Sequence, residues 1–138
     1  AEAIARRRLG NVEMAGHIPH AAVGDYYRRA AVAVLPSRCF ENSPHSMLEA
    51  MAYGRCVVAP DHGPIGEWIR DGHTGRVFAP GSAADLIRVV AEVLADASGA
   101  DRMGAAAAER VRAWHDPDDI LDRLERVYAE VAGLQGRQ

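Results

Sequence analysis

Short apolar runs alternate along this chain with longer segments in which apolar residues recur every three to four positions. The short runs are typical of strands buried on both faces of a parallel sheet, and the longer segments are typical of helices with one face on the core. The predicted strands cover residues 12–16, 31–35, 56–59 and 76–78. Three predicted helices cover residues 21–30, 44–53 and 101–114. A short helix closes at Trp68 and Ile69, and another opens at a capping box at residues 82–85. The last predicted helix begins at Pro117 and ends at Gly133.

Strand, helix and strand follow one another in this pattern, and such βαβ units build parallel sheets. We therefore expect an α/β fold, a Rossmann-like parallel sheet with flanking helices. A length of 138 residues suggests one domain, and no linker or internal repeat divides the chain.

The start of the predicted helix 44–53 is the part of the chain with the most chemistry. Ser43 is expected to be its N-cap, because a serine hydroxyl accepts a bond from a free backbone amide. Pro44 suits the first helical position, where no amide donor is needed. The amides of His45 and Ser46 would then point out of the positive end of the helix dipole, which is a place where anions bind.

Two carboxylates flank this helix start. Glu41 lies on the loop before it, and Glu49 lies eight residues later on its second turn. The loop leaves the carboxyl end of the predicted strand 31–35, and ligands of open parallel sheets bind at that edge. A ligand that carries both a phosphate and a hydroxyl-rich sugar would match this arrangement.

Composition excludes several classes of function. The net charge of −3 gives no basic footprint for nucleic acid. No apolar run approaches the length of a membrane span, and no signal peptide is visible. The basic residues are all arginine, which hints at a high-GC bacterial source. We expect Cys39 and Cys56 to be free thiols in a reducing, cytoplasmic compartment.

Other candidate chemistry is weak. The histidines have no metal-ligand spacing and are expected on the surface or in turns, so no metal site is expected. Asp118 and Asp119 are better explained as first-turn acids that complement a helix dipole than as a metal pair. The sequence contains no Ser-His-Asp set and no Gly-Lys-Thr loop, which argues against a hydrolase and a P-loop protein.

Several short blocks stand around Glu41 and Glu49. In chain order they are Gly16-His17-Ile18-Pro19, Tyr26-Tyr27, Leu35-Pro36-Ser37, Glu49-Ala50-Met51-Ala52-Tyr53-Gly54, Val57-Val58-Ala59, Gly66-Glu67 and Asp71-Gly72-His73-Thr74-Gly75. Over residues 12–131 this ordered series resembles the retaining "group 1" glycosyltransferases, and Glu41 through Glu49 matches the E-x7-E motif of that family.

The resemblance implies the GT-B architecture, in which two Rossmann-like domains face each other across a cleft. Residues 1–138 resemble the later part of the C-terminal domain, which binds the nucleotide-sugar donor. The family's first strands, the basic residues that hold the diphosphate, and the N-terminal acceptor domain have no counterpart in this sequence. We therefore expect the chain to be a fragment.

Residue roles follow from the resemblance. Glu41 would act near the transferred sugar as the catalytic carboxylate, and Glu49 would accept hydrogen bonds from the donor's ribose hydroxyls. The alternatives are a loop acid that orders its own backbone and an exposed helix carboxylate, and His45 is as well placed to pair with Glu49 as to meet a ligand. The other expected donor-binding residues are Asn42, Ser43, Pro44, His45 and Ser46, with Gly16 and Ile18 framing the nucleobase or forming a simple turn.

The predicted reaction moves a sugar from a nucleoside diphosphate to the hydroxyl of an unspecified acceptor, with retention of configuration and without a cofactor. The partners are thus the nucleoside-diphosphate sugar donor and the acceptor, with membrane-surface association left open through the missing N-terminal domain. A non-catalytic sugar-nucleotide-binding module that needs a separate acceptor-binding chain is the alternative. The E-x7-E pattern argues against a third reading, a sugar-nucleotide epimerase of the same architecture.

Overall fold

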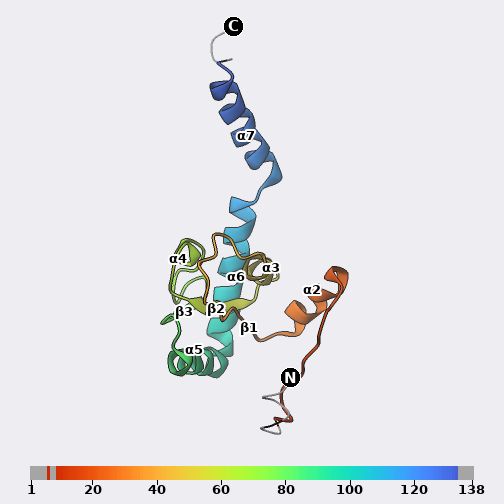
Figure 1. Ribbon diagram of the computed structural model, residues 1–138, viewed down its shortest axis with the longest axis vertical. Helices are drawn as coiled ribbons and strands as arrows, with labels where there is room; N and C mark the ends of the chain where they lie inside the picture. The colour runs from red at the N-terminus through yellow and green to blue at the C-terminus, as the bar shows by residue number, and fades with distance from the viewer. Residues whose placement is uncertain (1–5, 7–8, 134–138) are drawn as a thin grey trace.

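The computed structural model describes residues 6 and 9–133 (Figure 1). Its helices and strands, in chain order, are α2 (His20–Arg29), β1 (Val32–Val34), α3 (His45–Ala52), β2 (Cys56–Pro60), α4 (Ile65–Trp68), β3 (Arg76–Phe78), α5 (Ala83–Ala95), α6 (Ala97–Trp114) and α7 (Pro117–Val131). None of these helices combines the length and the hydrophobicity that crossing a bilayer requires.

The three strands form one parallel sheet in the order β1-β2-β3. Val32 pairs with Cys56 and Val58 pairs with Arg76, so the carboxyl ends of all three strands lie at the same edge of the sheet. The predicted α/β fold with a parallel sheet and flanking helices is therefore confirmed.

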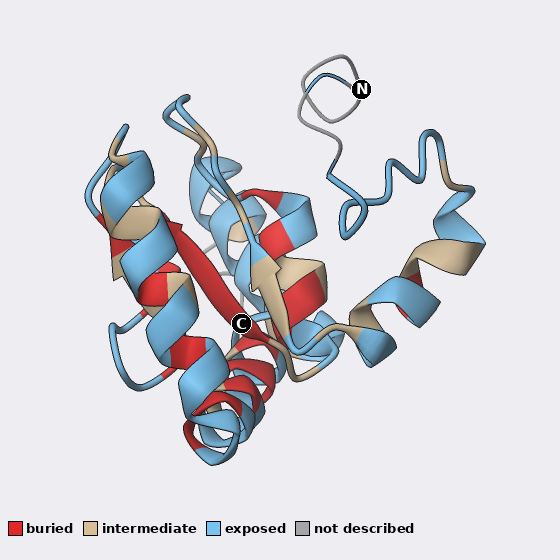
Figure 2. Ribbon diagram, turned by 90° about the horizontal axis from the view of Figure 1, so that it is seen from below, coloured by how far each residue is buried: buried red, intermediate tan, exposed pale blue. Residues whose placement is uncertain are grey.

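Helices cover both faces of the sheet, as the alternation of side chains along β2 requires. Val57 and Ala59 point into a core formed with α3, α4 and the second half of α6. Cys56 and Val58 point into a second core formed with α5, β3 and the first half of α6. Figure 2 shows the buried residues gathered on the sheet and on the inward faces of these helices.

The predicted strand 12–16 is wrong. In the structure these residues have no regular secondary structure, and Val12 and Met14 are exposed. A strand persists only where a neighbouring strand takes up its backbone amides and carbonyls. No strand in the described part of the chain pairs with this segment, so its apolar residues do not make it a strand.

The start of α3 also differs from the prediction, because Pro44 and not Ser43 is the N-cap. Pro44 has an extended backbone (φ −66°, ψ 112°), and its carbonyl accepts from the amides of Met47 at 3.0 Å and Leu48 at 3.2 Å. Ser43 makes no capping bond to the helix. At the other end Gly54 has the predicted left-handed conformation, with φ 68°.

The predicted cap at Ser82 is confirmed, since its hydroxyl accepts from the amide of Asp85 at 3.2 Å. The Asp85 carboxylate does not complete a capping box and instead accepts from the amide of Ala79 at 2.7 Å. Helix α6 begins before the predicted Asp101, at Ala97, because Asp96 caps it through the amide of Gly99 at 2.9 Å.

Helix α6 holds the turn between α3 and β2 by close backbone contact. Gly104 is buried, and a Cβ atom at this position would lie 2.1 Å from the carbonyl oxygen of Gly54 and 3.2 Å from the carbonyl carbon of Arg55. Only a residue without a side chain allows this approach. The helix therefore sets the position of the segment that carries α3.

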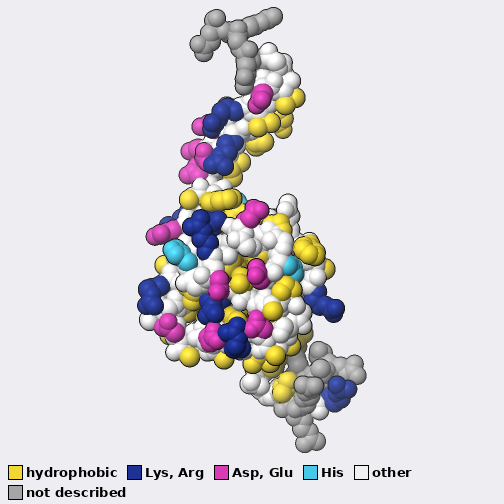
Figure 3. All heavy atoms as spheres, turned by 90° about the vertical axis from the view of Figure 1, so that its left-hand side faces the viewer, with side chains coloured by type: hydrophobic (Ala, Val, Ile, Leu, Met, Phe, Trp, Pro, Cys, Tyr) yellow, Lys and Arg dark blue, Asp and Glu magenta, His cyan; other side chains and the backbone are white. Residues whose placement is uncertain are grey.

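Helix α7 has the predicted apolar stripe but no buried residue. Figure 1 shows it projecting from the rest of the molecule, and Figure 3 shows its hydrophobic side chains on one side and its charged side chains on the other. The exposed apolar residues are Ile120, Leu121, Leu124, Val127, Tyr128 and Val131.

Candidate functional site

The candidate site lies beyond the carboxyl ends of β1 and β2, where the sequence predicted it. The loop after β1 carries Glu41, whose side chain is half-buried. The hydroxyl of Ser37 donates to Glu41 Oε1 at 2.5 Å and accepts from the amide of Cys39 at 3.3 Å. Glu41 is thus oriented by its own loop, and its second carboxylate oxygen has no hydrogen-bond partner among the described residues.

The loop after β2 closes against the same segment through an aromatic pair. The rings of Phe40 and His62 lie 5.0 Å apart between centroids at 33°, and Phe40 also covers Gly63. Both ring nitrogens of His62 are shielded from solvent and have no hydrogen-bond partner among the described residues. His62 was expected on the surface or in a turn. It does lie on a loop, but its ring nitrogens are not exposed to solvent.

Glu49 lies on α3 and is bound by two side chains of α2. The Tyr27 hydroxyl donates to Glu49 Oε2 at 3.3 Å and to the Ser46 carbonyl at 3.1 Å. His20 Nε2 lies 3.2 Å from Glu49 Oε1. Burial raises the pKa of Tyr27, and the charge of Glu49 and its hydrogen bond raise it further.

Two amides at the start of α3 are free to bind an anion. The backbone N–H groups of His45 and Ser46 make no hydrogen bond within the described chain, and both residues are exposed. They begin an eight-residue helix and so stand at the positive end of its dipole. Of the two alternatives for His45, the local pair with Glu49 does not form, and His20 lies beside Glu49 Oε1 instead, at 3.2 Å.

The other predicted site residues are spread over three places. Asn42 and Ser43 are exposed on the loop, and Pro44 is buried at the start of α3. Gly16, with φ 69°, and the half-buried Ile18 lie in the irregular segment before α2. The structure thus brings Glu49 and Ser46 together through Tyr27, and it places Gly16 and Ile18 on a separate segment.

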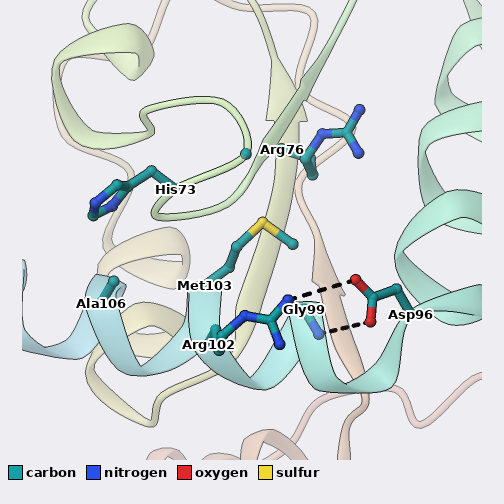
Figure 4. A pocket seen from close by; sticks show the side chains of 8 residues that line it. His73, Arg76, Asp96, Gly99, Arg102, Met103 and Ala106 are labelled. Carbon is teal, nitrogen blue, oxygen red and sulfur yellow. Dashed lines mark hydrogen bonds and ion pairs between the residues drawn. The ribbon is translucent and has the colours of Figure 1, made fainter.

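A small cavity of about 100 Å³ lies beside Glu49. A larger one, of about 450 Å³, lies at the amino end of β3, at the opposite end of the sheet from Glu41 (Figure 4). Its lining pairs Arg102 with Asp96 at 3.9 Å. The larger cavity is not the candidate site, because ligands of parallel sheets bind at the carboxyl edge and this cavity lies at the amino end.

The described residues contain no group of three or more His, Cys, Asp or Glu side chains that could hold a metal ion. The groups at the candidate site that can meet a ligand include two carboxylates and two free amides. Carboxylates accept from hydroxyl groups, and amides at a helix start donate to phosphate oxygens.

Comparison with known proteins identifies the family of this chain. A family model described as glycosyl transferases group 1 matches residues 2–110. The chain belongs to this family.

Two relatives are similar to this chain over most of its length. Glycogen synthase of Mycobacterium tuberculosis (strain CDC 1551 / Oshkosh) is 34% identical over 122 residues, which are 88% of this chain and 29% of the relative. The lipopolysaccharide core biosynthesis mannosyltransferase LpcC of Rhizobium leguminosarum bv. viciae is 35% identical over 133 residues, 96% of this chain and 37% of the relative. The chain thus spans about a third of the length of these relatives.

Several solved structures have the same fold as this chain. Sucrose-phosphate synthase from Thermosynechococcus elongatus superposes with a TM-score of 0.86 at 28% identity, over 97% of this chain and 34% of that one. HepE of Anabaena in complex with UDP and glucose superposes with a TM-score of 0.84 at 20% identity, over 94% of this chain and 35% of that one.

The sequence did not predict that side chains of α2 contact Glu49. His20 and Tyr27 lie seven residues apart and hence on one face of α2, which a helical-face analysis indicates. The contact of that face with Glu49 depends on how α2 and α3 pack, and no local pattern gives that. Phe40 and His62 were missed because they meet across two loops.

Proposed function

We propose that this chain is the donor-binding segment of a larger retaining glycosyltransferase with the GT-B architecture. The observation that carries the proposal is the pairing of Glu49 with two unbonded amides at the start of one helix. A nucleoside diphosphate presents ribose hydroxyls to a carboxylate acceptor and phosphate oxygens to amide donors, so one short helix offers complementary groups to both.

In this proposal the two glutamates contact different parts of the donor. Glu49 accepts hydrogen bonds from the ribose, and Glu41 lies toward the transferred sugar, where its charge favours the positive charge that develops as the glycosidic bond breaks. The amides of His45 and Ser46 stabilise the departing diphosphate. Asn42, Ser43 and Pro44 shape the loop between these groups, and Gly16 and Ile18 frame the nucleobase.

The similarity to a HepE structure with bound UDP and glucose supports a nucleoside-diphosphate sugar as the donor class. The match to about a third of each relative supports the view that the acceptor site belongs to another part of the protein. The solved C-terminal domain of a group 1 family protein, LpcC from Francisella tularensis, superposes with a TM-score of 0.69 at 17% identity over 83% of this chain, which supports a C-terminal assignment.

The test of the site is Glu49→Ala in the full-length protein. Loss of a charged acceptor costs about 1.5–3 kcal/mol, so the affinity for a nucleoside diphosphate without a sugar should fall roughly ten- to a hundredfold. Isothermal titration calorimetry with UDP, ADP and GDP measures this. Glu109→Ala, which removes an exposed carboxylate from α6, is the matched control and should leave the affinity unchanged.

Unchanged affinity in a folded Glu49→Ala protein would remove the ribose role. The second candidate, a binding module that works with a separate acceptor-binding chain, is favoured by the same coverage of one third. Reading the gene upstream of the codon for Ala1 decides between them. A continuous frame of about 200 or more further residues means one larger enzyme.

A further inference from the structure

The hydroxyl of Tyr27 connects α2 to the carboxylate on α3. It lies 3.1 Å from the Ser46 carbonyl and 3.3 Å from Glu49 Oε2. A phenol has a single hydrogen to donate, so the two acceptors share it. Both acceptors belong to α3, the helix that the proposed donor contacts.

The ring of Tyr27 is held in place from α3 as well as from its own helix. It stacks on Tyr53 with 5.6 Å between centroids and packs against the core that contains Met47 and Val57. Gly24 lets this stack form, because a Cβ atom there would lie 2.3 Å from the Tyr53 hydroxyl. The Tyr27 hydroxyl is therefore carried by a fixed ring.

The two oxygens of Glu49 have unequal surroundings. Oε2 faces the half-buried Tyr27, whereas Oε1 faces His20, whose side chain is 90% exposed. An exposed imidazole is easily displaced by a ligand, because water can take over its bonds. The packed ring of Tyr27 is not displaced in this way. The Glu49 oxygen that a ligand can reach is thus Oε1.

We propose that Tyr27 is a positioning residue for the ribose-binding carboxylate: its hydroxyl fixes Oε2 of Glu49, and Oε1 is presented to the donor ribose in place of His20. This inference rests on the proposed function and goes beyond it by naming what orients Glu49. Fixing the carboxylate before the ligand arrives lowers the ordering cost at binding.

The test is Tyr27→Phe in the full-length protein, with calorimetry against UDP and against 2′,3′-dideoxyuridine diphosphate. The substitution keeps the ring and its stacking and removes only the hydroxyl. We expect UDP to bind about three- to tenfold more weakly. The dideoxy ligand lacks the hydroxyls that Glu49 accepts from, so its affinity should change less than twofold.

The neighbouring Tyr26→Phe is the control and should change neither affinity, because the Tyr26 ring is exposed and contacts Arg29. Equal losses for UDP and the dideoxy ligand in Tyr27→Phe would mean that the hydroxyl only supports the fold. No loss for UDP would mean that Glu49 is oriented without it. Either result overturns the proposal.

Glu49→Gln separates this inference from the proposed function. If Glu49→Gln weakens UDP but not the dideoxy ligand, the ribose role holds, and Tyr27→Phe added to it should then weaken UDP by less than twofold more. If Glu49→Gln weakens both ligands equally, the ribose role fails and the positioning role fails with it. A ribose-specific loss in Glu49→Gln but not in Tyr27→Phe refutes the positioning role alone.

Discussion

A methyl group at Gly104 is expected to destabilise the protein although it improves the helix. Alanine is favoured over glycine inside a helix by about 1 kcal/mol. The added Cβ would lie 2.1 Å from the Gly54 carbonyl oxygen and 2.8 Å from its carbonyl carbon, which are backbone atoms that cannot rotate away. The helix and the turn must therefore separate by about 1 Å to relieve the overlap.

That separation loosens contacts along the buried face of α6. A gap of about 1 Å removes up to half of the attraction between packed atoms, and overpacking of this kind costs about 1–3 kcal/mol or more. The residues that lose contact are Ala100, Ala107, Ala108 and Val111. Because the overlap is with backbone atoms, we take the upper part of that range, about 2–3 kcal/mol. After subtraction of the gain in helix propensity, we expect Gly104→Ala to lose about 1–2 kcal/mol and to lower the melting temperature by about 4–8 °C.

Thermal unfolding followed by circular dichroism measures this difference. Gly66→Ala in α4 is the matched control, because nothing lies within 4 Å of a Cβ atom there and the position is exposed. It should be neutral or stabilise the protein by up to about 1 kcal/mol. A Gly104→Ala protein as stable as the wild type would show that α6 does not approach the turn as closely as described.

Three further outcomes are expected. Burial, offset in part by Arg76, raises the pKa of Cys56 from 9.0 to about 11, so the free energy of unfolding should fall by up to about 2–3 kcal/mol between pH 9 and 11. Cys56→Ala should abolish that part of the slope in urea unfolding, and an identical slope would refute the assignment. In the full-length protein, Glu41→Gln should lower kcat more than it weakens UDP binding, and equal losses would place Glu41 in the nucleotide site. The 138-residue chain alone should transfer no sugar from a panel of nucleotide sugars, and turnover at ordinary enzyme rates would contradict that expectation.

Most of the helices and strands could be predicted from the sequence, because the interactions that define them join residues close together along the chain. Strand β2 is a continuous apolar run, and α7 combines an Asp116 cap with a regular stripe. The Ser82 cap likewise uses an amide three residues away. Each of these features requires only neighbours along the chain.

The errors have two sources, distant parts of the chain and the choice of a helix cap. The segment 12–16 has the composition of a strand but no pairing partner among the described residues. Ser43 has the side chain that favours an N-cap, but the extended backbone of Pro44 starts the helix one residue later. The contact of Tyr27 with Glu49 depends on how α2 is placed against α3, so the carboxylates of the site could be predicted from the sequence but the side chains that hold them could not.

The exposed stripe of α7 has a consequence for how this chain unfolds. A fifteen-residue helix that buries no side chain draws little support from tertiary packing, and isolated helices of that length are marginal in water. Its amide protons should therefore exchange with solvent long before those of β2, whose residues are all buried. Heating the chain would accordingly produce a gradual loss of helix signal ahead of the cooperative transition, and the two parts would report different free energies.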